Sequence, residues 1–162
     1  MLIGLPAGLA AVLYLGTAAR TITWEHGGAD GPELAAVAYL LGVAHPTGYP
    51  LYTMLGHLFT LLPIGEVAFR MALFSTACGC VAVTLVAAMV RRLSPEDDSS
   101  RIFGAGAGGL SLAVAPLFWS QANVTEVYSL NMALLSCALL LLAIWRPGRD
   151  VVLSPTSVAY GT

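Results

Sequence analysis

Residues 67–90 read VAFRMALFSTACGCVAVTLVAAMV, and this stretch decides the fold class. It is longer than the roughly 20 mostly apolar residues that a helix needs to cross a bilayer. Arg70 is its single charged residue, and the pair Arg91–Arg92 follows directly. The stretch therefore predicts a membrane-spanning α-helix that begins near Val67 and ends at a cluster of positive charge.

The composition of the whole chain agrees with a membrane protein. The 162 residues are 57 % hydrophobic and only 10 % charged, and the mean hydropathy is +0.80. A soluble domain of this length needs far more charge to cover its surface. The net charge of −2 and the absence of a basic stripe predict no nucleic-acid partner.

Three further apolar runs, residues 2–19, 102–120 and 127–145, are candidates for membrane spans. Together with residues 67–90 they predict an all-α, polytopic membrane protein with about four transmembrane helices. Residues 2–19 have an alternative interpretation as a cleaved signal peptide, because Thr17-Ala18-Ala19 resembles a cleavage site. No basic segment precedes this run, which favours a retained helix.

Two shorter helices are expected inside the polar segment 20–65. Pro32 and Gly42 bound a helical pattern over residues 32–41. Residues 49–62 are apolar on one side and polar on the other, and they are too short to span comfortably. We therefore expect both helices to lie in the membrane interface or to line a cavity.

The distribution of arginines predicts the orientation, because positive charge marks the cytoplasmic side. The segments assigned to the cytoplasm are those that carry Arg91, Arg92 and Arg101 and, after the last apolar run, Arg146 and Arg149. Residues 20–65 and 119–126 then face the other side. We expect an integral protein of a bacterial plasma membrane, with its active site facing outside.

Asp30 and Glu33 are the first candidate site residues. Asp-x-x-Glu ahead of a helix is a capping box, in which Asp30 caps the first N–H groups and Glu33 reaches back. The alternative is catalytic, because a carboxylate facing a cavity can take a proton from an acceptor hydroxyl. Both interpretations stay open, since one carboxylate can do both.

Other polar residues should reach the same face of the membrane. His45 and Tyr49 stand in a stiff His-Pro-Thr-Gly-Tyr-Pro segment, which is either a structural elbow or a binding loop. Arg70, near the outer end of its span, either extends toward lipid headgroups or binds a lipid phosphate. Glu126 and Tyr128 lie at the outer mouth of the last span. No metal-ligand signature is present, because Cys78-x-Cys80 has no second pair.

Several segments together resemble a known family of membrane enzymes. They are GADGPEL at 28–34, HPTGYPLY at 45–52, VAFR at 67–70, FWSQA at 118–122, and EVY at 126–128 with Asn131. Over about residues 1–146 this text is similar to the protein O-mannosyltransferases of the transmembrane-protein-260 type, within the GT-C superfamily of glycosyltransferases. Gly31 and Thr47 replace the serine and proline usual there.

The resemblance implies a fold and an activity. The fold is a GT-C-like N-terminal module with two short helices in its first outer loop. The reaction moves a hexose, possibly mannose, from a polyprenyl-phosphate sugar to a protein or glycan hydroxyl, with inversion. Asp30 is then the base, Glu33 or Glu126 orients the acceptor or holds a divalent metal, and His45 and Arg70 bind the donor phosphate.

The resemblance also predicts that the chain is part of a longer protein. Family members carry more spans, so residues 147–162 form a short tail of what we expect to be a fragment. The alternative function is a non-enzymatic membrane protein, either part of a transporter or a scaffold that binds lipid-phosphate sugars.

Overall fold

The computed structural model describes residues 4–24, 30–94 and 97–145. These residues form helices joined by loops, which confirms the all-α prediction. The helices are α1 (Gly4–Thr17), α2 (Gly31–Leu40), α3 (Pro50–Thr60), α4 (Val67–Leu93), α5 (Asp98–Ala113), α6 (Pro116–Ala122) and α7 (Tyr128–Ile144). Arg146, Arg149 and the tail 147–162, on which part of the predicted topology depends, lie outside the described residues.

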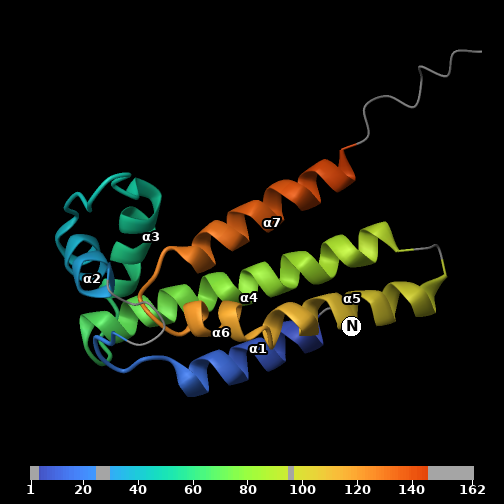
Figure 1. The fold of residues 1–162 in the computed structure, drawn as a ribbon, viewed down its shortest axis with the longest axis horizontal. Helices are drawn as coiled ribbons and strands as arrows, with labels where there is room; N and C mark the ends of the chain where they lie inside the picture. The colour runs from blue at the N-terminus through green and yellow to red at the C-terminus, as the bar shows by residue number, and fades with distance from the viewer. Residues whose placement is uncertain (1–3, 25–29, 95–96, 146–162) are drawn as a thin grey trace, which may run out of the picture.

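Helix α4 is the centre of the fold, and α1, α5 and α7 pack along it (Figure 1). Small residues let these helices approach closely. A Cβ atom on Gly79 would lie 3.0 Å from Cβ of Ala122 and 3.2 Å from the ring of Tyr14. The hydroxyl of Tyr14, which is fully buried, donates to the Ala113 carbonyl at 2.9 Å. One contact region therefore joins α1, α4, α5 and α6.

Membrane-length helices are fewer than the four predicted. Among the described residues α4 alone is long and apolar enough to cross a membrane. Helices α1 and α7 are apolar but have 14 and 17 residues. The structure therefore shows one clear span, and the other predicted spans are not shown.

A bend of 65° between α5 and α6 divides the predicted span 102–120. Pro116 begins α6 and cannot donate a backbone hydrogen bond to the preceding turn. A proline also disfavours helical backbone in the residue before it, and Ala115 is extended with φ −62° and ψ 119°. The two helices count as one span only if this bent pair crosses together.

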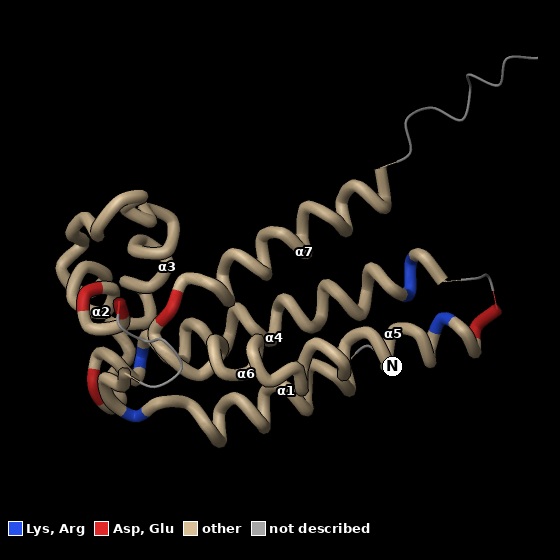
Figure 2. Tube along the Cα trace, viewed as in Figure 1, with Lys and Arg blue, Asp and Glu red and all other residues tan. Residues whose placement is uncertain are grey.

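In the described part of the chain, charged residues gather at the two ends of the molecule, and the middle portions of the helices carry none (Figure 2). One end, which we call the α2–α3 end, holds Arg20, Asp30, Glu33, Glu66, Arg70 and Glu126. The opposite end holds Arg91, Arg92, Asp97, Asp98 and Arg101. Leucines on the intervening surface are exposed, Leu141 and Leu142 of α7 among them. This arrangement suits a protein whose apolar middle lies in lipid.

Helices α2 and α3 form a hairpin at the α2–α3 end, beside the first turns of α4 and α7 (Figure 1). They lie close to the predicted ranges 32–41 and 49–62. Leu34 and Ala38 of α2 and Tyr52 of α3 are buried against Met71 and Phe74 of α4. This apolar cluster fixes the two short helices on the end of the bundle, where they can hold polar side chains over a cavity.

Candidate functional site

A pocket of about 460 Å³ opens at the α2–α3 end, between α2, α3 and the start of α7. Four of the seven predicted site residues line it, namely Asp30, Tyr49, Glu126 and Tyr128. The remaining wall is mainly apolar and includes Leu34, Leu51, Val127, Leu130 and Leu134. The structure therefore brings residues from both predicted outer loops to one cavity.

Hydrogen bonds between the backbone of Glu126 and α4 fix this residue beside the pocket. The Ser75 hydroxyl of α4 donates to the Glu126 carbonyl at 3.2 Å, and the Glu126 N–H donates to the same hydroxyl at 3.4 Å. The neighbouring Thr125 hydroxyl donates to the Ala68 carbonyl at 3.1 Å. The α6–α7 loop is thus tied to α4. A Cβ on Gly31 would lie 3.4 Å from the Thr125 carbonyl oxygen, so the start of α2 lies against this loop.

The carboxyl group of Glu126 has an unusual environment. The residue is only 3 % exposed, and burial raises the pKa of this carboxyl to about 6. The negative charge of Asp30 raises that pKa further. A buried acid opposes ionisation, as does a like charge nearby. Glu126 therefore titrates near pH 6, and shifted pKa values of this kind are common among residues that work in catalysis.

The capping box predicted for Asp30 and Glu33 is wrong. Asp30 is the residue before α2, yet its side chain makes no capping hydrogen bond. Both oxygens of Glu33 instead engage His45: the backbone N–H donates to Oε1 at 2.7 Å, and Nδ1 lies 3.0 Å from Oε2. Glu33 therefore joins α2 to the His-Pro segment, and the Asp30 carboxylate does not cap the helix.

His45 lies between Asp30, the residue before α2, and Glu33 of α2. Its Nε2 is 3.8 Å from Oδ2 of Asp30, and its ring contacts the ring of Tyr49 edge-on at 5.4 Å. The hydrogen bond to Glu33 raises the pKa of His45, and the same bond lowers the pKa of Glu33. Each group favours the charged form of the other, so this pair favours a histidine cation beside the pocket.

Arg70 makes contacts that neither sequence interpretation anticipated. Its guanidinium donates to three backbone carbonyls of the α3–α4 connection: Nη1 to Thr60 at 2.6 Å, Nε to Ile64 at 2.8 Å and Nη2 to Gly65 at 3.0 Å. Arg70 does not line the pocket. A cation is favourable at the C-terminal end of a helix, here α3. Arg70 therefore stabilises the α3–α4 connection, which fixes the position of α3 beside the pocket.

Tyr52 is a pocket residue that the sequence analysis did not select. It is 2 % exposed, and its hydroxyl makes no hydrogen bond within the described part of the chain. Tyr49 precedes α3 in a left-handed conformation, so helical spacing gave no signal for Tyr52. Asn131, in the first turn of α7, also lines the pocket. In the described ranges no group of three or more His, Cys, Asp and Glu side chains is arranged to hold a metal.

Comparison with known proteins places this chain in a family. The family model described as "Protein O-mannosyl-transferase TMEM260 N-terminal domain" matches residues 30–157. The chain belongs to the TMEM260 N-terminal domain family. That range includes every predicted site residue, and the resemblance seen in the sequence is confirmed.

Two curated TMEM260 relatives show how far the similarity extends. The chain is 42 % identical over 109 residues to "Protein O-mannosyl-transferase TMEM260" of Mus musculus, covering 64 % of this chain and 14 % of the relative. It is 31 % identical over 121 residues to the protein of that name from Dictyostelium discoideum, covering 73 % of this chain and 14 % of the relative. The chain thus spans about a seventh of these TMEM260 proteins. No solved structure matches it.

Proposed function

We propose that this chain forms the donor-side active-site module of a membrane glycosyltransferase that moves a hexose, mannose by its family, to a hydroxyl of a protein or glycan. The donor in this proposal is a polyprenyl-phosphate sugar. The observation that carries it is the cavity at the α2–α3 end, where Asp30 and the buried Glu126 face one space. Membership of the TMEM260 family supplies the reaction class.

Asp30 is the proposed general base. Its side chain is 54 % exposed, makes no cap bond and lines the cavity, so it is available to an incoming hydroxyl. In the displacement the acceptor oxygen forms a bond to the anomeric carbon as the bond from that carbon to the phosphate oxygen breaks. The hydroxyl proton passes to Asp30, and polyprenyl phosphate leaves. One displacement inverts the anomeric centre.

Glu33 is predicted as a catalytic residue from the sequence, and we propose that it acts through His45. Both of its oxygens are engaged by that residue. The histidine cation that it favours is suited to the donor phosphate, because charge-assisted hydrogen bonds to phosphate are strong. Arg70, with three of its five N–H groups on backbone carbonyls, supports α3 in this proposal and leaves the phosphate to His45.

Glu126, Tyr49 and Tyr128 complete the proposed substrate cavity. The Glu126 carboxylate accepts a hydrogen bond from the acceptor, and the two tyrosines contact the sugar. A divalent metal, if the reaction needs one, would find the carboxylates of Asp30 and Glu126 as its ligands. Asp30 and Glu126 are hard oxygen donors of the kind that Mg²⁺ prefers.

The proposed site faces the extracytoplasmic side. Arg91, Arg92 and Arg101 lie at the opposite end of the molecule, and positive charge marks the cytoplasmic surface. The cavity then opens where the headgroup of a lipid-linked donor would lie. A bacterial plasma membrane stays a prediction from the sequence.

The proposed function is tested by supplying the intact protein, in lipid nanodiscs, with labelled mannose on two donors. Transfer to a Ser/Thr peptide is expected from polyprenyl-phosphate mannose and not from a nucleotide mannose, with the opposite anomeric configuration in the product. Transfer from the nucleotide sugar alone, or retained configuration, would contradict the donor and the mechanism. No transfer from either donor would favour the non-enzymatic alternative.

A further inference from the structure

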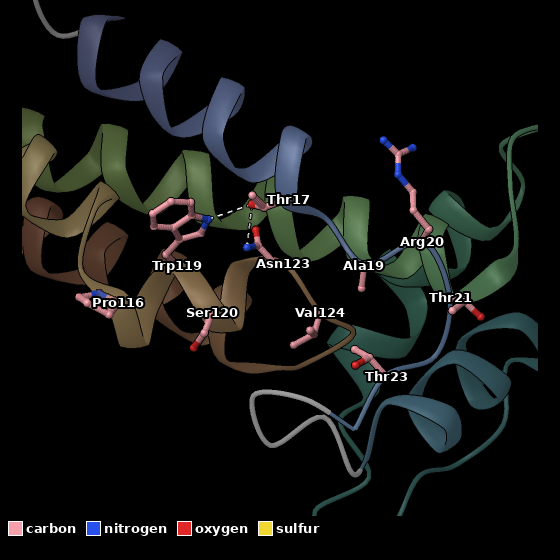
Figure 3. Close-up of a pocket in the computed structure, with 10 residues that line it drawn as sticks. All are labelled: Thr17, Ala19, Arg20, Thr21, Thr23, Pro116, Trp119, Ser120, Asn123 and Val124. Atoms are coloured by element: carbon pink, nitrogen blue, oxygen red, sulfur yellow. Dashed lines mark hydrogen bonds between the residues drawn. The ribbon is translucent and has the colours of Figure 1, made fainter.

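A second pocket of similar size, about 470 Å³, lies between the end of α1 and α6 (Figure 3). Its wall includes Ala19, Pro116, Trp119, Ser120, Asn123 and Val124. We propose that this pocket binds a segment of the acceptor polypeptide, an inference that rests on the transferase function proposed above.

A buried amide in this pocket lacks one hydrogen-bond partner. The Thr17 hydroxyl donates its single hydrogen to the Leu13 carbonyl at 2.6 Å, and it accepts from Trp119 Nε1 and from Asn123 Nδ2, both at 2.9 Å (Figure 3). The hydroxyl has no further hydrogen to give, so the Asn123 atom that faces it must be the amide nitrogen.

This fixed orientation leaves the amide oxygen of Asn123 without a donor. The residue is 8 % exposed, and its Oδ1 has no hydrogen-bond partner among the described residues. An unpaired buried acceptor costs free energy in the folded protein. A ligand that brings an N–H group into the pocket would remove that cost, after a shift of the side chains that cover the oxygen.

The charge of the pocket argues against the donor as its occupant. Arg20 is the one charged residue among those that line it, and its guanidinium is turned away from the other side chains (Figure 3). That guanidinium lies over the ring of Phe69, 4.6 Å from the ring centre. No cation therefore faces a phosphate here, whereas a lipid-linked donor needs one.

The chemistry of the wall favours a polypeptide over a sugar. The surface is mainly apolar, and its uncharged polar side chains are those of Thr17, Thr21, Thr23, Ser120 and Asn123. The Ser120 hydroxyl gives its own hydrogen to the Leu117 carbonyl at 2.8 Å, and the amide oxygen of Asn123 lies beneath the surface. A hexose carries hydroxyl groups on every side and would leave most of them unpaired against such a wall. An extended peptide carries one N–H per residue and apolar or small side chains between them.

The position of the pocket connects it with the proposed active site. A small recess shares Thr21, Thr23 and Val124 with the pocket and reaches Gly31, the residue after Asp30. The recess has a volume of only about 10 Å³, so it marks the direction from the pocket toward Asp30. In this proposal, peptide held in the pocket presents a neighbouring serine or threonine hydroxyl to the base.

The test is photo-cross-linking, which needs no turnover. Benzoylphenylalanine replaces Ser120, which is half-buried in the pocket wall, or Ala19 on the facing segment, and Ser99 at the opposite end serves as matched control. A biotinylated Ser/Thr peptide is expected to cross-link at positions 120 and 19 and not at 99, and an unlabelled peptide should compete. Melting temperatures are measured on each variant to verify folding.

Cross-links to lipid or within the chain itself, or equal peptide labelling at all three positions, would overturn the proposal. If the proposed transferase function is wrong, the wild-type protein shows no sugar transfer, and this result is independent of the cross-linking. In the transfer assay Ser120→Phe should raise the acceptor KM about tenfold or more, since it fills the pocket, and should leave the donor KM unchanged.

Discussion

Replacement of Asp30 by asparagine is expected to lower the rate of sugar transfer by about 100- to 10,000-fold, the usual effect of removing a general base. Asparagine has nearly the shape of aspartate but cannot accept the proton of the acceptor hydroxyl. The side chain makes no capping hydrogen bond to α2, so the change should not unfold the protein. The variant should bind the donor and melt at the wild-type temperature.

The control for Asp30→Asn is Glu33→Gln. The glutamine side chain keeps an oxygen that can accept from the backbone N–H of His45, and its loss of charge should lower the pKa of His45. The rate of this control should fall less than that of Asp30→Asn, with a weaker affinity for the donor. Near-normal transfer by a folded Asp30→Asn protein would remove Asp30 from the mechanism.

Glu126→Gln is expected to have the second largest effect, a fall of about 10- to 100-fold in kcat/KM for the acceptor, corresponding to one lost charge-assisted hydrogen bond. The wild-type rate should rise with pH through about 6, where the Glu126 carboxyl loses its proton. The glutamine side chain does not titrate, so this limb of the profile should be absent from the variant. A limb near pH 6 that persists in Glu126→Gln would assign it to another group.

The same substitution has a predictable effect on stability. The pKa of Glu126 is raised from its ordinary 4.5 to about 6, so the folded protein binds this proton more tightly than the unfolded chain does. The contribution of Glu126 to the free energy of unfolding therefore falls as pH rises from about 4.5 to 6 and stays level above. Glu126→Gln should gain stability relative to wild type across that window. If the difference in melting temperature between Glu126→Gln and wild type does not vary with pH, the pKa of Glu126 is not raised in the folded protein.

The sequence predicted the parts of the fold that depend on local pattern. The apolar run 67–90 sufficed for α4. Proline and glycine signals located α2, and the helical spacing of apolar and polar residues located α3, both to within a few residues. The bend at Pro116 was missed because hydropathy averages over the run 102–120, although the proline itself was visible. Span counting by hydropathy alone thus overstated the continuity of that segment.

The side-chain partners within the site could not be predicted from the sequence. Asp30 and Glu33 have the spacing of a capping box, and the competing partner of Glu33, His45, is twelve residues away across a turn. Arg70 was expected either to extend toward lipid headgroups or to bind a lipid phosphate, because a cation in an apolar helix needs a partner. The three carbonyls that it contacts are exposed by the end of α3, a feature of the folded backbone rather than of the residue types.

The most direct test of the central claim is whether a polyprenyl-phosphate sugar enters the pocket of Asp30 and Glu126. Asn131 lines that pocket and is exposed, so Asn131→Cys, with the exposed Cys137 changed to serine, reports its occupancy by the rate of thiol alkylation. Ser99→Cys at the opposite end is the matched control. Polyprenyl-phosphate mannose is predicted to slow alkylation at position 131 and to leave position 99 unchanged. Equal rates at position 131 with and without saturating donor would contradict the assignment of this pocket as the donor site.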